Sequence, residues 1–167
     1  ISYAYGEQIV IHDVTLSVQR KRPLILCGRS GKGKTTLANV LVGLYFPENG
    51  DVFYVGESGE RYSGAHYSAK VGFVTQDVYL FKGTLRENLL AGRESVDEDI
   101  WSVLDQVDAS HFVRQLGGLD TESAEAGRSL SGGQRRRLGV ARVLLSGADI
   151  LIFDEVTAGL DQTNKSA

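Results

Sequence analysis

A glycine-rich segment, GRSGKGKT at residues 28–35, sets the strongest limit on how this chain can fold. It fits the pattern G-x-x-x-x-G-K-[ST] at every position, follows the apolar run Leu24–Cys27 and precedes a helical pattern over Thr36–Leu44. Glycines let the backbone turn so that several N–H groups point toward one centre, and the start of the helix adds its own free N–H groups. A strand, this turn and a helix in succession predict a loop that binds the phosphates of a nucleotide.

The positions of this loop have distinct chemical roles in the prediction. Lys34 would reach the β- and γ-phosphates, and the hydroxyl of Thr35 would bind Mg²⁺. The residues expected to bind nucleotide here are Gly28, Arg29, Ser30, Gly31, Lys32, Gly33, Lys34, Thr35 and Thr36. The alternative is a glycine-rich turn with a surface lysine, and the flanking strand and helix patterns argue against it.

Two acidic residues follow a second apolar run, Ile150–Phe153. A carboxylate that ends a buried strand beside a phosphate-binding loop can hold Mg²⁺ through water, and we assign this role to Asp154. Glu155, the next residue, would polarise the water that attacks the γ-phosphate. An acidic turn after a strand is common, so this prediction depends on the loop at 28–35.

The composition is that of one globular domain and excludes several kinds of protein. The chain has 167 residues, 42% of them hydrophobic, and a net charge of −3, which provides no general basic field for nucleic acid. The only cysteine, Cys27, excludes an internal disulfide, and we interpret it as a small buried side chain at the end of its strand. No apolar run has the length of a membrane span, so the isolated domain should be soluble.

Strand patterns occur in five runs along the chain. The runs Leu24–Cys27 and Ile150–Phe153 are apolar at successive positions, as in strands buried on both faces of a parallel sheet, and Val71–Val74 is a weaker third member. Alternating apolar and polar residues over Val14–Gln19, preceded by the run Ile9–Ile11, predict half-buried strands of an antiparallel N-terminal β-subdomain.

Helical patterns lie between these strands. Apolar residues recur at helical spacing over Ile100–Val107, directly after the acidic residues Asp97–Asp99, and again over Leu138–Leu145. Strands that alternate with helices indicate an α/β fold. We therefore predict one domain over residues 1–167, with a P-loop nucleoside-triphosphatase core built on a parallel sheet and a helical subdomain inserted at about 84–146.

The segment LSGGQ at residues 130–134 is a turn of small residues that opens a helix. It would form a second helix N-terminus that attracts anions, far along the chain from Lys34. Two such helix starts in one chain are hard to direct at the same nucleotide. A second molecule resolves this geometry if each copy contributes one element to the nucleotide bound by the other.

These motifs together resemble those of ATP-binding cassette (ABC) proteins over nearly the whole chain. In that family the segment containing Ser131, Gly132, Gly133 and Gln134 is the signature motif, which reaches the nucleotide of the partner copy. The resemblance implies roles for three further residues. Gln76 matches the glutamine that approaches the metal and the attacking water. Tyr5 matches the aromatic residue that stacks on adenine, with Tyr3 as a competitor, and Asp161 matches the aspartate that reaches across the dimer. The resemblance implies Glu155, Gln76 and Lys34 as catalytic residues, and Thr35, Gln76 and Asp154 as residues at the metal.

The resemblance also implies a function, partners and a location. It implies that the chain binds ATP and Mg²⁺ and hydrolyses ATP as a head-to-tail dimer with an identical or different nucleotide-binding domain. Hydrolysis would power a transmembrane domain at the cytoplasmic face of a membrane. The segments Leu80–Asn88 and Thr121–Gly127 resemble exporters, whereas Ala158-Gly159 resembles importers, and Ser123-Ala124 replaces the valine-glycine pair usual in exporters.

One element of the family pattern has no counterpart in this sequence. The histidine that contacts the γ-phosphate in the family lies well beyond the catalytic glutamate, and His12, His66 and His111 match no such motif. Because the chain also begins at Ile1 and contains no methionine, we interpret it as a segment of a longer polypeptide whose C-terminal part is missing. Two alternatives stay open: a cassette ATPase that is not coupled to a membrane, and a nucleotide-binding module without turnover.

Overall fold

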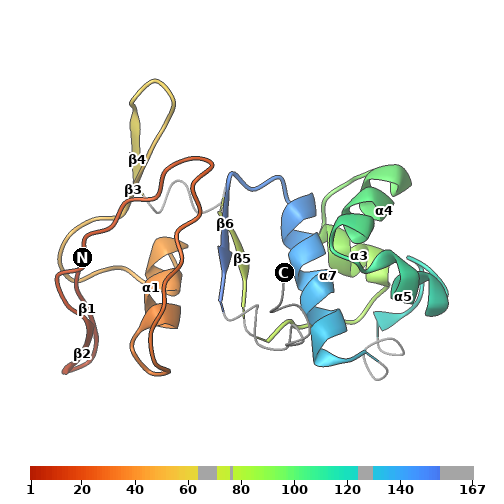
Figure 1. The fold of residues 1–167 in the computed structure, drawn as a ribbon, viewed down its shortest axis with the longest axis horizontal. Coiled ribbons are helices and arrows are strands. Elements are labelled where there is room, and N and C mark those ends of the chain that lie inside the picture. Colours follow the sequence, from red (N-terminus) through yellow and green to blue (C-terminus); the bar gives the residue numbers. More distant parts are fainter. Residues whose placement is uncertain (64–70, 76, 124–129, 155–167) are drawn as a thin grey trace, which may run out of the picture. The chain divides into compact units, whose positions relative to one another are not determined.

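The computed structural model describes residues 1–63, 71–75, 77–123 and 130–154 (Figure 1). The chain divides into two compact units, residues 1–71 and 72–167, each of which has its own elements. Mixed strands and helices, with a parallel strand pair and antiparallel pairs, confirm the predicted α/β fold class.

Where the structure describes it, the first unit consists of two small antiparallel strand pairs and one helix. Strand β1 (Tyr3–Tyr5) pairs with β2 (Gln8–Ile11), and β3 (Phe53–Val55) pairs with β4 (Arg61–Ser63). Helix α1 (Lys34–Leu41) covers the β1–β2 pair with its apolar side, where Leu37 and Val40 pack with Ile11. The strand predicted at Ile9–Ile11 and the antiparallel character of the N-terminal region are therefore confirmed.

Two strands predicted in the first unit are absent from its described residues. Val14 and Leu16 do turn inward against the core of Ile11, but residues 14–19 form no strand ladder. Residues 24–27 are neither a strand nor buried: Ile25 is 79% exposed, and the thiol-bearing Cys27 is exposed as well. The physical reason is that a strand is held by hydrogen bonds from a neighbouring strand, and the described residues supply none beside this segment.

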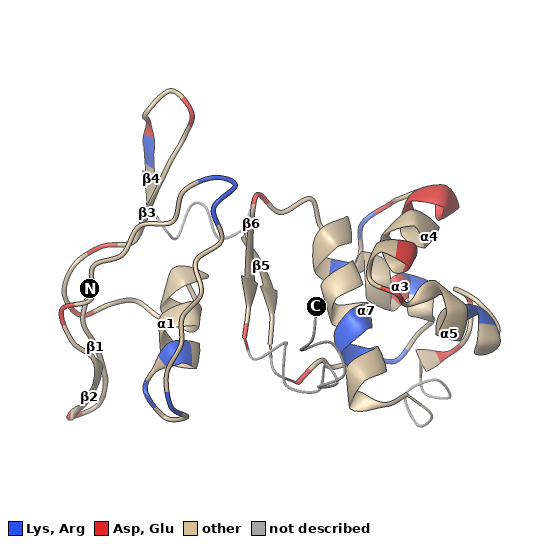
Figure 2. Ribbon diagram, viewed as in Figure 1, with Lys and Arg blue, Asp and Glu red and all other residues tan. Residues whose placement is uncertain are grey.

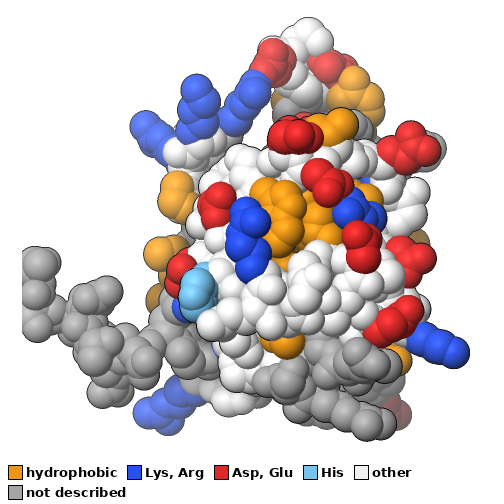
Figure 3. Space-filling model, turned by 90° about the vertical axis from the view of Figure 1, so that its right-hand side faces the viewer, with side chains coloured by type: hydrophobic (Ala, Val, Ile, Leu, Met, Phe, Trp, Pro, Cys, Tyr) orange, Lys and Arg blue, Asp and Glu red, His pale blue; other side chains and the backbone are white. Residues whose placement is uncertain are grey.

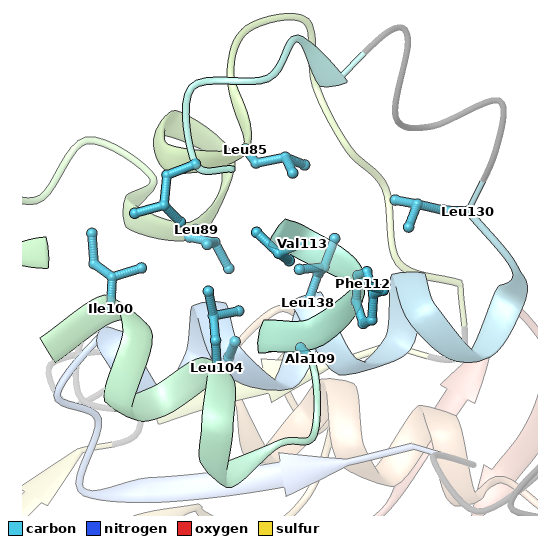
Figure 4. Close-up of a cluster of buried hydrophobic side chains, with 11 residues drawn as sticks. Leu85, Leu89, Ile100, Leu104, Ala109, Phe112, Val113, Leu130 and Leu138 are labelled. Atoms are coloured by element: carbon cyan, nitrogen blue, oxygen red, sulfur yellow. The ribbon is translucent and has the colours of Figure 1, made fainter. Parts of the chain in front are cut away.

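The described residues of the second unit include four helices: α3 (Leu85–Leu90), α4 (Asp97–Gln106), α5 (Ser110–Gln115) and α7 (Gly132–Leu145). Their apolar faces meet in one core (Figure 4). Leu85, Ile100 and Leu104 have no exposed surface there. Figure 3 views this helical side of the molecule, where a small hydrophobic area lies among charged side chains. In the described part of the chain, no helix has the length and apolar content needed to cross a membrane.

The sequence explains where these helices begin and end. Thr84 caps α3 and exchanges hydrogen bonds with Glu87, and three acidic residues occupy the first turn of α4, where the helix dipole favours them. Helix α7 ends at Leu145, followed by Gly147 with a φ of 65°, a conformation that suits glycine. Both long helical patterns in the sequence are confirmed.

Strands β5 (Val71–Val74) and β6 (Ile150–Phe153) form a parallel pair, as predicted for these two segments. The Asp154 amide donates to the Val74 carbonyl at 2.9 Å, so the two strands end side by side. The prediction that β6 is buried on both faces is wrong, since Phe153 is 46% exposed and Leu151 37% exposed. Among the described residues of this unit, α7 covers the pair on one side, where Gly72 lies against Val143.

The helical core offers a direct test of the packing. Leu104 is fully buried, and Leu104→Ala should lower the free energy of unfolding by about 2–5 kcal/mol, through lost burial and the cavity left behind. Trp101 is the only tryptophan and packs against the same core, so its fluorescence during urea unfolding reports on this unit. The control is Leu44→Ala, which truncates a leucine that is 64% exposed. Equal effects of the two substitutions would contradict the described core.

Candidate nucleotide-binding site

The loop at residues 28–33 has the backbone conformation that its glycines predict. Gly31 and Gly33 have φ angles of 77° and 81°, in the left-handed region that other residues rarely adopt. A Cβ atom on Gly33 would also lie 3.0 Å from Val10 Cγ1 and 3.1 Å from the Val10 carbonyl oxygen. Gly33 is therefore required both by its φ angle and by the close approach of β2, and it leads directly into α1.

The side chain of Lys34 lies back across this loop. Its Nζ donates to the Gly28 carbonyl at 2.9 Å and to the Arg29 carbonyl at 3.1 Å. Figure 2 shows basic residues gathered where the loop enters α1. The first turn of α1 has neither a side-chain cap nor an acidic residue, so no side chain of the helix start competes for its free N–H groups. These donors and the ammonium group fit the phosphates of a nucleotide.

Three tyrosines form a cluster beside the start of α1. The rings of Tyr3 and Tyr45 are stacked, with centroids 5.3 Å apart and an angle of 8° between the planes. Tyr5 meets both of them edge-on, is 47% exposed, and has its hydroxyl 3.4 Å from Thr36 Oγ1. Hydrogen bonding and electrostatic interaction with Tyr5 raise the pKa of Tyr45. Because a face of Tyr3 is already occupied by Tyr45, the geometry favours Tyr5 over Tyr3 as the ring available to an aromatic ligand.

Residues predicted to hold the metal lie in both units. Thr35 is exposed at the start of α1 in the first unit, whereas Asp154 is 8% exposed at the end of β6 in the second. No group of three or more His, Cys, Asp or Glu side chains in the described ranges could hold a metal by itself. A hydroxyl and a carboxylate are each oxygen ligands of the kind that Mg²⁺ takes in proteins, and their common role at one metal stays a prediction.

The predicted catalytic residues Gln76 and Glu155, and Asp161, lie outside the described residues. The same is true of Ala158-Gly159. The roles of all five stay predictions.

The signature segment forms the capped N-terminus of α7. The Ser131 hydroxyl accepts from the Gln134 amide at 3.2 Å, and the Gln134 side chain accepts from the Ser131 amide at 2.8 Å. Gly132 and Gly133 are exposed, and no atom lies within 4 Å of the position that a Cβ of Gly132 would take. Among the described residues, no close packing explains a glycine at 132.

Sequence analysis did not identify a polar network around Arg142, a residue of α7. Arg142 Nε donates to the Asn88 carbonyl at 2.7 Å, and its two terminal nitrogens reach the Tyr79 carbonyl at 3.1 and 3.2 Å. Burial lowers the pKa of this guanidinium group. The sequence holds one signal, because Arg142 follows Leu138 by four positions and precedes Leu145 by three, which places a charge in an apolar stripe.

A cluster of ion pairs connects α3, α4 and the chain after α5. Arg86 pairs with Asp97 at the start of α4 and with Asp120, whose Oδ1 lies 2.8 Å from Arg86 Nε. Hydrogen bonds from the guanidinium lower the pKa of Asp120, and those to Asp120 and Asp97 raise the pKa of Arg86. The cluster is partly exposed, so it positions these elements more than it stabilises them.

The fold and the loop define the chain as a P-loop nucleotide-binding domain. The family model for the ABC transporter matches residues 11–158. Among the similar proteins, a multidrug resistance ABC transporter ATP-binding and permease protein of Lactococcus lactis subsp. cremoris is 38% identical over 99% of this chain and 29% of its own length. An ATP-dependent lipid A-core flippase of Francisella tularensis subsp. holarctica is 33% identical over 99% of this chain and 28% of its own length.

A solved structure of a bacterial Atm1-family ABC exporter with ATP bound matches with a TM-score of 0.68 and 32% identity, covering 80% of this chain and 24% of that one. The chain therefore belongs to the ABC transporter family and corresponds to its ATP-binding domain. These relatives are of the exporter type, as the segment at Leu80–Asn88 predicts. The chain spans less than a third of the length of the relatives described above.

Proposed function

We propose that this chain binds Mg-ATP and hydrolyses it in a head-to-tail pair of nucleotide-binding domains, and that hydrolysis powers transport across a membrane. The observation that carries the proposal is the loop before α1, where the Lys34 ammonium lies across the loop and the first turn of α1 has no side-chain cap, an arrangement that suits phosphates. Membership of the ABC transporter family supports the choice of ATP as the nucleotide. The domain would act at the cytoplasmic face, joined to or associated with a transmembrane domain.

The residues of the chain divide the chemistry between them. Lys34 would exchange its two carbonyl acceptors for the β- and γ-phosphates and neutralise charge on the transferred group. Thr35 would bind Mg²⁺ directly and Asp154 through water, and the bound ion offsets negative charge on the phosphate oxygens. Glu155 would orient and deprotonate the attacking water, with Gln76 beside it.

The exposed N-terminus of α7 supports the proposal that a second copy of the domain completes the nucleotide site. Ser131 presents a hydroxyl and free helix N–H groups, and the exposed glycines at 132 and 133 leave room for a phosphate to approach closely. A γ-phosphate bound to the loop of one copy would occupy this position on the other copy, and Asp161 would lie at the same interface. Coupling to a transmembrane domain is supported by the exporter relatives, which also argue against a cassette ATPase that acts away from membranes.

A mixing experiment tests the head-to-tail arrangement in the full-length gene product. Lys34→Ala removes the phosphate-binding ammonium, whereas Ser131→Asp keeps a good helix cap but sets a carboxylate against the γ-phosphate. Each variant alone should be inactive. Equal mixing should restore roughly a quarter of the ATP turnover, because half of the pairs are mixed and each holds one intact site.

The mixing experiment has two informative outcomes besides restoration. No restoration after subunit exchange, shown by co-purification of two affinity tags, would reject the head-to-tail site. Full ATP binding without turnover in the unmutated protein would instead support the alternative of a nucleotide-binding module that does not hydrolyse ATP.

A further inference from the structure

A partly buried polar network joins α7 to the chain segment that follows β5. Asn88 on α3 is 1% exposed and holds this segment from one side: its amide donates to the Phe81 carbonyl at 2.9 Å, and its oxygen accepts from the Phe81 amide at 2.9 Å. Arg142 on α7 holds the other side through the Tyr79 carbonyl and also reaches the Asn88 side chain at 3.3 Å. The Ser123 hydroxyl also holds this segment, since it donates a hydrogen bond to the Phe81 carbonyl at 2.5 Å.

Close packing holds the same segment at a second point on α7. A Cβ atom on Gly139 would lie 2.5 Å from Val78 Cγ2 and 3.0 Å from Val78 Cγ1. Any larger residue at 139 would push Val78 away, because the short β-branched side chain has little freedom to move aside. Gly139 and Arg142 lie on α7 three positions apart, and they contact residues 78 and 79 in the same order.

The guanidinium group is suited to this task in a way that an ammonium group is not. Arg142 bonds two backbone carbonyls that belong to different elements, at residues 79 and 88, and its planar fork fixes the distance between them. The ring of Phe81 lies 5.7 Å from the guanidinium carbon and adds a cation–π contact. Removing Arg142 would therefore release the segment from α7 and take away the donor to the carbonyl of Asn88, a residue that is 1% exposed.

The position of this segment in the sequence gives the network a functional meaning. It begins two residues after Gln76, and it follows β5, whose last residue accepts a hydrogen bond from Asp154. At its other end, α7 begins at Ser131. We propose that Arg142 is a positioning residue that fixes residues 78–81 on the signature helix, so that this segment, which follows Gln76 in the sequence, and the Ser131 helix start are set together for hydrolysis. This inference rests on the proposed function.

The test measures ATP turnover of the full-length gene product at a temperature at which every variant is folded. Arg142→Gln should lower kcat about tenfold and change KM for Mg-ATP less than twofold, since the phosphate-binding loop is untouched. Arg142→Lys should give an intermediate kcat, because one ammonium can donate to a carbonyl but cannot span both. The matched control is Arg137→Gln on the same helix, which removes a bond to Asp108 within the helical cluster and should leave kcat unchanged.

A compensating pair separates positioning from stability. Gly139→Ala should lower kcat by displacing Val78, and adding Val78→Ala should restore most of it by making room for the new methyl group. Unchanged kcat in Arg142→Gln, or a loss that follows unfolding of the helical unit as reported by Trp101, would overturn the positioning role alone. An unmutated protein that hydrolyses no ATP would instead overturn the proposed function, and the positioning role with it.

Discussion

Lys34→Ala is expected to remove measurable Mg-ATP binding from the chain, a loss of affinity of at least about 100-fold. Among the described residues, the ammonium group has two carbonyl acceptors and no carboxylate partner, so the phosphates would supply strong counter-charges. Alanine leaves the loop backbone intact, because the conformation depends on Gly31 and Gly33. Isothermal titration of Mg-ATP into the chain measures the effect directly.

The control for this prediction is Lys82→Ala, which removes the same charge from an exposed site in the other unit and should leave the affinity unchanged. Circular dichroism of both variants establishes that α1 and the remaining helices are retained. Binding that survives Lys34→Ala would mean that the loop at 28–35 is not the nucleotide site. In that case the helix start at Ser131 would be the next candidate for the nucleotide site.

Local sequence signals predicted α1, α4, α7 and the loop because their causes are local. The acidic first turn of α4, the glycine after α7 and the glycines before α1 each act within a few residues of their position. The Asp154 carboxylate was likewise expected at the end of a strand, where the structure places it.

Strand burial could not be predicted in the same way, because it depends on which neighbours are present. Leu24–Cys27 and Ile150–Phe153 have similar apolar patterns, yet only the second forms a strand, since β5 lies beside it. Apolar composition reports that a segment is suited to burial, whereas the hydrogen-bonding partner decides whether a strand forms. The same reasoning explains the exposure of Cys27, whose predicted burial assumed that its strand would be covered.

The Arg142 network escaped prediction for a different reason. Its acceptors are the backbone carbonyls of residues 79 and 88, and every residue type offers a carbonyl. Sequence patterns carry information about side chains. A contact between an arginine and main-chain atoms distant in the sequence therefore produces almost no pattern from which it could be predicted. The replacement of the usual pair by Ser123-Ala124 can be explained in part, since the Ser123 hydroxyl bonds the Phe81 carbonyl in the same network.

Glu155→Gln is expected to abolish hydrolysis while leaving ATP binding intact. An amide cannot accept the proton of the attacking water, and loss of a general base lowers turnover by about 100- to 10,000-fold. Because the phosphate-binding loop and Ser131 are unchanged, ATP should still bring two copies together, and the pair should persist instead of separating after turnover. Sedimentation velocity of the full-length gene product with and without Mg-ATP measures this accumulation, alongside phosphate release.

The matched control is Glu94→Gln, which makes the same change at an exposed site outside the proposed catalytic residues and should leave both turnover and association as they are. Combining Glu155→Gln with Ser131→Asp sharpens the result, because the carboxylate should prevent the ATP-dependent pair from forming. A Glu155→Gln variant that still hydrolyses ATP would exclude this residue as the base. A variant that binds ATP but stays monomeric would exclude the shared site, since only a second copy supplies Ser131 to the nucleotide in the proposed arrangement.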